Sequence, residues 1–262
     1  MVSFAVHPLH NPALLSAAYQ PLADLLGSRI PGIHVDLEAS RDYRDFEAKI
    51  QARKPALLLP NPWQALQAME VGYEVIAMAG DREDFRGILL VRRDSGITTI
   101  RQLKGRRVSY PSPTALAACI MPQMLMRDRG LDVMREVDHR YVGSQESSMM
   151  NVYLKLTEAG ATWPTPWRGF QKSHPAEARD LRVLGETPAL VNNAVMVRKD
   201  LDPDLKARIR AQLIHLHEHE EGRRVLGGME IRRFHPAKDA DYEPVRAYVA
   251  RFERLVRPVV QP

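Results

Sequence analysis

Short apolar segments alternate with helical patterns along most of the chain, and this alternation is the feature that most constrains the fold. "VSFAV" (2–6), "ALLLP" (56–60) and "YEVIAMA" (73–79) have the apolar character of strands in a buried sheet. Between them, "DYRDFEAKIQAR" (42–53) carries apolar residues at i, i+3 and i+7, which is typical of an amphipathic helix. Strands that alternate with helices predict an α/β fold.

The same alternation continues through the second half of the chain. A helix is expected from Pro113 to about Arg129, and the chain after Pro203 is mainly helical to residue 257. Further strands are expected at 87–93, 106–110, 138–143, 159–164, 181–186 and 193–199. The 262 residues are enough for one large domain or for two lobes.

Charge and cysteine content exclude several classes of protein. The formal net charge is +5, but the Arg-Arg pairs are interleaved with acids and form no basic stripe, so no nucleic-acid partner is expected. A single cysteine rules out an internal disulfide and a cysteine-built zinc site. No apolar run approaches the roughly 18 residues of a membrane span, so no membrane insertion is expected.

The first residues, "MVSFAVHPLHNP", lack a basic segment followed by an apolar one, which is the pattern of a signal peptide. The expected location is therefore the cytoplasm, or the periplasm if a signal peptide has been removed.

Four segments resemble a known family. "LLVRRDSGITTIRQLKGRRVSY" and "NNAVMVRKDLDPDLKARI" are similar to two strand-and-helix segments of the periplasmic substrate-binding proteins of phosphonate/phosphate-type ABC importers, the PhnD-like proteins. "DYRDFEAKI" and "VGSQESSMMNV" resemble two helical segments of the same family. The order and spacing of these segments extend the resemblance over nearly the whole chain.

The resemblance implies a two-lobed, type II periplasmic-binding-protein fold with two crossing strands, near 88–93 and 192–198. It places 1–90 and 192–262 in lobe one and 91–191 in lobe two, with a ligand cleft between the lobes. It further implies a monomeric solute-binding receptor that binds a small molecule and needs no cofactor. Such a receptor delivers its solute to an ABC permease or reports it to a sensor kinase.

The segment "PSPTALAACIMP" (111–122) departs from the family pattern. Counting back from Pro122, the hydroxyl-rich stretch that binds the anion in the family falls on residues 115–118, which are Ala, Leu, Ala and Ala. Ser112 or Thr114 takes over that role only if the alignment shifts slightly. The family histidine falls on Gln145 and the family acid on Gly160. We therefore expect phosphate and simple alkylphosphonates to bind poorly, and another small organic molecule to be the ligand.

Aromatic residues replace the missing polar groups. All three tryptophans fall in loops that follow predicted strands, and tryptophan offers a large contact area for a planar, apolar or cationic ligand. Glu146 is a candidate counter-charge. The expected ligand-binding residues are Tyr43, Asn61, Trp63, Tyr110, Ser112, Thr114, Ala115, Gln145, Glu146, Trp163, Thr165 and Trp167.

Two other functions stay open at this point. The first is a cytoplasmic enzyme on the same fold, of the dehydratase or cofactor-biosynthesis type, although no nucleophile–base–acid trio or phosphate loop is recognisable. The second is a binder of an oxyanion, a phosphonate or a metalloid, in which Cys119 would capture the metalloid.

The histidine-rich segments invite a metal site but do not meet its requirements. "HLHEHEE" (215–221) lacks the HExxH order, so a solvated helix face is expected and no metal is. His7, His10 or Asn11 could reach a ligand, although capping of a helix by Asn11 is as good an explanation of that residue.

Overall fold

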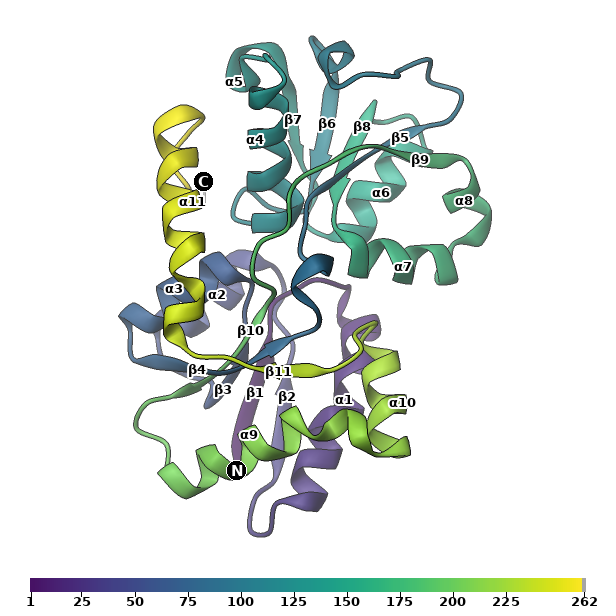
Figure 1. Cartoon of the computed structure of the whole chain (residues 1–262). Helices are drawn as coiled ribbons and strands as arrows, with labels where there is room; N and C mark the ends of the chain where they lie inside the picture. Colours follow the sequence, from purple (N-terminus) through teal and green to yellow (C-terminus); the bar gives the residue numbers. More distant parts are fainter. Residues whose placement is uncertain (261–262) are drawn as a thin grey trace. The chain divides into compact units, whose positions relative to one another are not determined.

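The protein is described by a computed structural model that covers residues 1–260, and it divides into two compact units (Figure 1). Unit 1 consists of Met1–Arg82 and Val191–Arg246. Unit 2 consists of Glu83–Leu190 and the chain from Ala247 onward. Each unit has its own mixed sheet, which confirms the predicted α/β class.

The unit 1 sheet has six strands in the order β11-β4-β10-β3-β1-β2. Strand β1 is parallel to β2 and β3, whereas β10 is antiparallel to β3 and β4, and β11 is antiparallel to β4. The bounds are β1 Val2–Val6, β2 Val35–Glu38, β3 Leu57–Leu59, β4 Tyr73–Ala79, β10 Ala194–Arg198 and β11 Phe234–Pro236.

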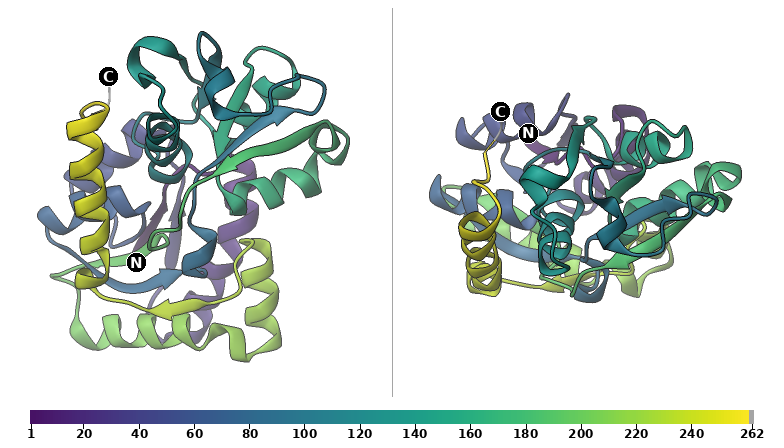
Figure 2. Two further views of the ribbon diagram at one scale, coloured as in Figure 1. Left: turned by 45° about the horizontal axis from the view of Figure 1, so that its top comes forward. Right: turned by 90° about the horizontal axis from the view of Figure 1, so that it is seen from above.

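Polar N-caps begin the principal helices of unit 1. Asn11, Asp42, Asn61 and Asp202 each accept a hydrogen bond from a backbone N–H of the first turn. Helices α1 and α10 pack side by side over the core (Figure 2). The bounds are α1 Pro12–Arg29, α2 Tyr43–Gln51, α3 Pro62–Glu70, α9 Pro203–Ile214 and α10 Glu220–Gly228.

The unit 2 sheet has five strands in the order β7-β6-β8-β5-β9. Strand β6 is parallel to β7 and β8, and β5 is antiparallel to β8 and β9. The bounds are β5 Ile88–Arg92, β6 Arg107–Tyr110, β7 Asp138–Tyr141, β8 Ala159–Thr162 and β9 Leu181–Glu186.

The helices of unit 2 include one irregular turn. A π-helical turn, Leu116–Ile120, leads directly into helix α4, Met121–Asp128. The other helices are α5 Val133–Glu136, α6 Gln145–Tyr153, α7 Pro164–Ser173 and α8 Pro175–Arg179. The π turn is η3, and the 3-10 turns are η1 Arg82–Asp84, η2 Ile100–Leu103, η4 Leu216–Glu218 and η5 Asp239–Tyr242, of which η4 and η5 belong to unit 1.

The C-terminal segment differs from the expected division, which assigned 192–262 to lobe one. Helix α11, Glu243–Leu255, begins in unit 1, and from Ala247 onward the chain groups with unit 2. Polar contacts explain this grouping, because Arg251 pairs with Asp128 at 3.3 Å and Arg257 bonds to Gln123 at 3.0 Å. The chain therefore passes from one unit to the other before β5, before β10 and once more within α11.

Candidate functional site

Three strands of unit 2 end at one edge of the sheet, and most of the candidate residues follow them. Strands β6, β7 and β8 are parallel, so their carboxyl ends share an edge. In α/β sheets this edge is where ligands bind. The loop 111–115 follows β6, Ser144 and Gln145 come shortly after β7, and Trp163 to Thr165 follow β8.

The loop after β6 carries two buried hydroxyls. Ser112 Oγ and Thr114 Oγ1 lie 3.1 Å apart, and both side chains are buried. The Thr114 backbone N–H donates to Ser112 Oγ at 3.3 Å, and the Ala115 N–H donates to the Ser112 carbonyl at 3.2 Å. The loop is thus a compact turn that holds both hydroxyls ahead of a helix start.

The alanines at this helix start are buried, and the backbone there packs closely against the segment before β5. Ala115, Ala117 and Ala118 are buried in unit 2. A Cβ added to Gly87 would lie 2.6 Å from the Ala117 carbonyl oxygen, so the backbone of the π turn approaches the segment before β5 closely. The absence of a side chain at Gly87 permits this approach.

A π turn leads from this loop into helix α4. Its hydrogen bonds run from Met121 N–H to the Leu116 carbonyl and from Ile120 N–H to the Ala115 carbonyl, so the turn holds one residue more than an α-helical turn. This turn joins the loop 111–115 to α4, and Ser112 and Thr114 are the buried hydroxyl-bearing residues ahead of it.

Gln145 and Thr165 lie near the same edge. Thr162 Oγ1 donates to Gln145 Oε1 at 2.9 Å, which ties the start of α6 to the end of β8. Ser144 caps α6 by accepting from the Ser147 N–H at 3.0 Å. Glu146, in the first turn of α6, lies 3.9 Å from His174, and Thr165 is buried at the start of α7.

Gly160 does not occupy a ligand-facing position. It lies within β8, and a Cβ there would lie 2.6 Å from both the Ser148 carbonyl oxygen and Val152 Cγ2 of helix α6. A side chain at this position would meet helix α6, so close packing between β8 and α6 explains the glycine. Ser148 Oγ, which donates to the Ala161 carbonyl at 2.8 Å, holds α6 against the strand.

The aromatic candidates of unit 2 are mostly packed. Trp163 is only 4% exposed, and its ring lies 5.5 Å from that of Phe85. Trp167 is half-buried and stacks on Phe170 at 5.9 Å. Tyr110 is fully buried, with its hydroxyl 3.2 Å from His139 Nδ1. Trp163 and Tyr110 thus have structural roles whether or not they also meet a ligand.

The candidates of unit 1 lie at the carboxyl ends of its parallel strands. Tyr43 begins α2 after β2 and is buried, with its ring 6.3 Å from that of His7, which follows β1. Asn61 follows β3 and caps α3 through a reciprocal pair of bonds with Gln64 at 3.0 and 3.2 Å. Trp63, in the first turn of α3, is half-buried.

Sequence reasoning missed two polar residues of unit 1. Ser40 Oγ and Asn193 Oδ1 are buried and have no hydrogen-bond partner within residues 1–260. Ser40 follows β2, and Asn193 precedes β10, whose first residue Ala194 bonds to the Pro60 carbonyl beside Asn61. The doubled asparagine before a strand in "VNNAVMV" was the available signal.

Two histidines of unit 1, the buried His7 and the half-buried His10, make its stability depend on pH. Burial lowers the pKa of His7 and of His10 from 6.5 to about 4, and His7 Nδ1 donates to the Leu59 carbonyl at 3.0 Å. The unfolded chain binds these protons first, so stability is full above pH 6.5 and falls as the pH drops toward 4.

We therefore expect each histidine to cost about 2 kcal/mol of stability at pH 5. Urea unfolding at pH 7.5 and pH 5 checks this, with H7Q as the test variant and H34Q, at an exposed histidine, as the control. If H7Q and H34Q lose the same stability between the two pH values, His7 is not the group that titrates.

A metalloid site would need an accessible Cys119, a metal site would need a cluster of ligating side chains, and a membrane span would need a long apolar helix. Cys119 is fully buried and burial raises its pKa to about 12, so it lacks the accessible thiolate that captures a metalloid. Within residues 1–260, no group of three or more His, Cys, Asp or Glu side chains is arranged to hold a metal ion. In that same part of the chain, no helix is both long and apolar enough to cross a membrane.

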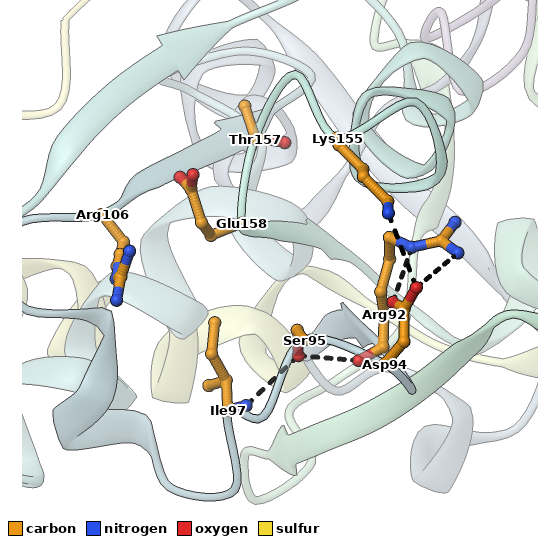
Figure 3. A pocket seen from close by; sticks show the side chains of 8 residues that line it. All are labelled: Arg92, Asp94, Ser95, Ile97, Arg106, Lys155, Thr157 and Glu158. Carbon is orange, nitrogen blue, oxygen red and sulfur yellow. Dashed lines mark hydrogen bonds and ion pairs between the residues drawn. The ribbon is translucent and has the colours of Figure 1, made fainter.

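A pocket of about 240 Å³ lies at the other edge of the unit 2 sheet, by the amino ends of β6 and β8 (Figure 3). Arg92 donates to Asp94 at 2.8 Å, and Lys155 lies 3.6 Å from the same carboxylate. Glu158 accepts from Arg107 at 2.7 Å. The "RRDS" segment that resembles the family thus forms ion pairs that hold strand ends, away from the candidate ligand residues.

Comparison with solved structures places the fold. A binding protein component of an ABC phosphonate transporter from Pseudomonas aeruginosa superposes with a TM-score of 0.89 at 16% identity, covering 97% of this chain and 87% of the other. PhnD1 from Prochlorococcus marinus, in complex with methylphosphonate, gives a TM-score of 0.88 at 16% identity, covering 97% of this chain and 98% of the other. An alkanesulfonate-binding protein SsuA from Xanthomonas axonopodis pv. citri, bound to MOPS, gives a TM-score of 0.67 at 15% identity, covering 99% and 95%. These likenesses confirm the type II periplasmic-binding-protein fold.

Among curated proteins, a probable ABC transporter phosphite binding protein of Prochlorococcus marinus is 19% identical over 194 residues, which are 69% of this chain. The matched region spans 65% of that relative. The names of these proteins do not support the expectation that phosphonates bind poorly and that the ligand belongs to another class.

The family model of the phosphonate periplasmic substrate-binding proteins of ABC transporters matches residues 4–242, most of both units. It describes a transport protein, not the enzyme considered as an alternative. The chain belongs to the family of periplasmic phosphonate substrate-binding proteins of ABC transporters.

Proposed function

We propose that this protein is the substrate-binding component of an ABC importer and that it captures a small solute with a tetrahedral oxyanion head group, of the phosphonate, phosphite or sulfonate class. The observation that carries the proposal is the pair of buried hydroxyls, Ser112 and Thr114, at the carboxyl edge of parallel strands and ahead of a helix start. Hydroxyls and first-turn N–H groups are donors that suit an anion. The partner is then an ABC permease, as the family implies.

The arrangement favours binding over catalysis. Hydroxyls, amides and backbone N–H groups donate hydrogen bonds but are poor nucleophiles at neutral pH without a base beside them. The half-buried ring of Trp167, in α7 after β8, provides apolar surface for an organic substituent on the head group. Trp63, Asn61 and Tyr43 of unit 1 remain proposed ligand residues.

Replacing Thr114 with valine is expected to weaken methylphosphonate binding about tenfold, because one hydrogen bond to a charged ligand contributes about 1.5–3 kcal/mol. Calorimetric titration with methylphosphonate, phosphite, methanesulfonate and arginine measures both affinity and class. We expect the three oxyanions to bind with different affinities and arginine not to bind.

T98V is the matched control, because Thr98 is exposed and lies outside the loop 111–115. Its hydroxyl donates to Gln102 Oε1 at 3.2 Å. If the wild-type protein binds none of the oxyanions, the proposed ligand class is wrong. If T114V and T98V bind methylphosphonate equally well, the anion does not meet the hydroxyl pair.

A further inference from the structure

One arginine of the C-terminal segment reaches the hydroxyl-bearing loop of unit 2. Arg257 Nη2 donates to the Pro113 carbonyl at 2.7 Å, and its Nε donates to Gln123 Oε1 at 3.0 Å. Nη1 donates to the Pro258 carbonyl at 2.9 Å, and Nη2 lies 3.5 Å from Cys119 Sγ. The Arg257 side chain thus hydrogen-bonds both to the loop before the π turn and to the helix after it.

The charge of Arg257 is not neutralised by these partners. All four acceptors are neutral, and within residues 1–260 no carboxylate forms an ion pair with this guanidinium. Two other arginines of unit 2 do form ion pairs: Arg251 pairs with Asp128, and Arg92 pairs with Asp94 and Asp180. A half-buried cation without a counter-ion raises the positive potential around it.

The neighbouring side chains do not offset this charge. Tyr110 and Tyr141 are neutral phenols whose pKa values are raised, chiefly by burial. His139 is neutral at pH 7 because burial lowers its pKa, and the charge of Arg257 lowers it further. Arg257 is therefore the fixed charge of this cluster.

The peptide between Pro113 and Thr114 links the charge of Arg257 to the side of the loop that carries the hydroxyls. In a trans peptide the C=O and N–H groups point in opposite directions. Arg257 holds the Pro113 carbonyl, so the Thr114 N–H points to the other side, where it meets Ser112 Oγ at a long 3.3 Å. A bond from a cation to the carbonyl polarises the peptide and makes its N–H a better donor to an anion.

We propose that Arg257 supplies the positive charge for the anionic solute, acting through the Pro113–Thr114 peptide as a positioning residue that fixes and polarises the loop. This inference rests on the proposed function. The positive charge that the neutral Gln145 does not provide then comes from the C-terminal segment.

The test is calorimetric titration of the whole protein with methylphosphonate at several salt concentrations. Four proteins are compared: wild type, R257Q, R257K and R254Q. Arg254 is an exposed arginine one turn earlier and is the matched control. R257Q is expected to bind methylphosphonate about thirtyfold more weakly than wild type. R257K keeps the charge but not the bonds to two partners, and it is expected to regain most of the affinity.

The dependence of affinity on salt distinguishes an electrostatic role of Arg257 from a purely structural one. The fall of affinity with salt is expected to be shallower in R257Q than in wild type, R257K and R254Q, because one attractive charge has been removed. A purely structural role would lower the affinity without changing this slope.

Equal losses in R257Q and R257K with unchanged slopes overturn the inference, as does an R257Q affinity within twofold of wild type. Failure of the wild-type protein to bind methylphosphonate, phosphite and methanesulfonate overturns the proposed function, and the inference with it. If the thermal unfolding curve shows that R257Q does not fold, R257K is compared with R254Q instead. Equal affinities and an equal dependence of affinity on salt support the charge role. A thirtyfold loss of affinity in R257K overturns it.

Discussion

Replacing Trp163 with alanine is expected to lower the free energy of unfolding by about 3–5 kcal/mol, because the change removes a large buried ring and leaves a cavity. Only 4% of the side chain is exposed, and the ring packs against Phe85 within unit 2. Denaturant unfolding followed by far-UV circular dichroism measures the loss. The effect on methylphosphonate binding is measured on the folded fraction, so that stability and affinity are separated.

Trp63 provides the matched control for this substitution. It lies in a corresponding position after β3 but is only half-buried, so W63A is expected to cost much less stability. A W163A protein within about 1 kcal/mol of wild type would mean that the Trp163 pocket collapses or that its ring contributes little to the core.

Replacing Gly160 with alanine is expected to cost on the order of 3 kcal/mol and to weaken ligand binding. The new methyl group would lie 2.6 Å from the Ser148 carbonyl oxygen, which is backbone and cannot move without α6. Overpacking of this kind costs about 1–3 kcal/mol, and more where the neighbour is held in place. Because Gln145 begins α6, displacement of the helix moves a candidate ligand residue as well.

G227A is the control, since Gly227 lies in helix α10 with open space around its Cβ position. There we expect unchanged or slightly increased stability, because alanine is the better helix former by up to about 1 kcal/mol. If G160A and G227A are equally stable, β8 and α6 adjust to the extra methyl group, and the close approach does not explain the glycine.

The fold was predictable because its signals are local. Apolar runs such as residues 56–60 are too short for helices and too apolar for exposed strands, and they form the buried strands β3 and β4 where the alternation predicted them. Asparagine before proline at 11–12 and 61–62 marks the starts of α1 and α3, because each side chain caps the backbone it precedes.

The candidate site was less predictable because its contacts are remote in sequence. Nothing near Pro113 indicates that Arg257 binds its carbonyl, since 144 residues separate them. The π turn at 116–120 has no compositional signature, and the regular helix expected from Pro113 begins only at Met121, after this turn. Gly160 carried a signal of close packing, yet alignment alone assigned it to ligand contact.

The order of chain segments in the two units has a consequence for folding during synthesis. Neither unit is continuous: unit 1 needs Val191–Arg246, and unit 2 needs the chain from Ala247 onward. On the ribosome, the first 190 residues therefore emerge without β10, which lies between β3 and β4, and without β11, which forms one edge of the unit 1 sheet. Since domains fold as units, neither unit can complete its fold until these later segments have left the ribosome, and a chain cut short before Arg257 would lack the hydrogen bond to the Pro113 carbonyl.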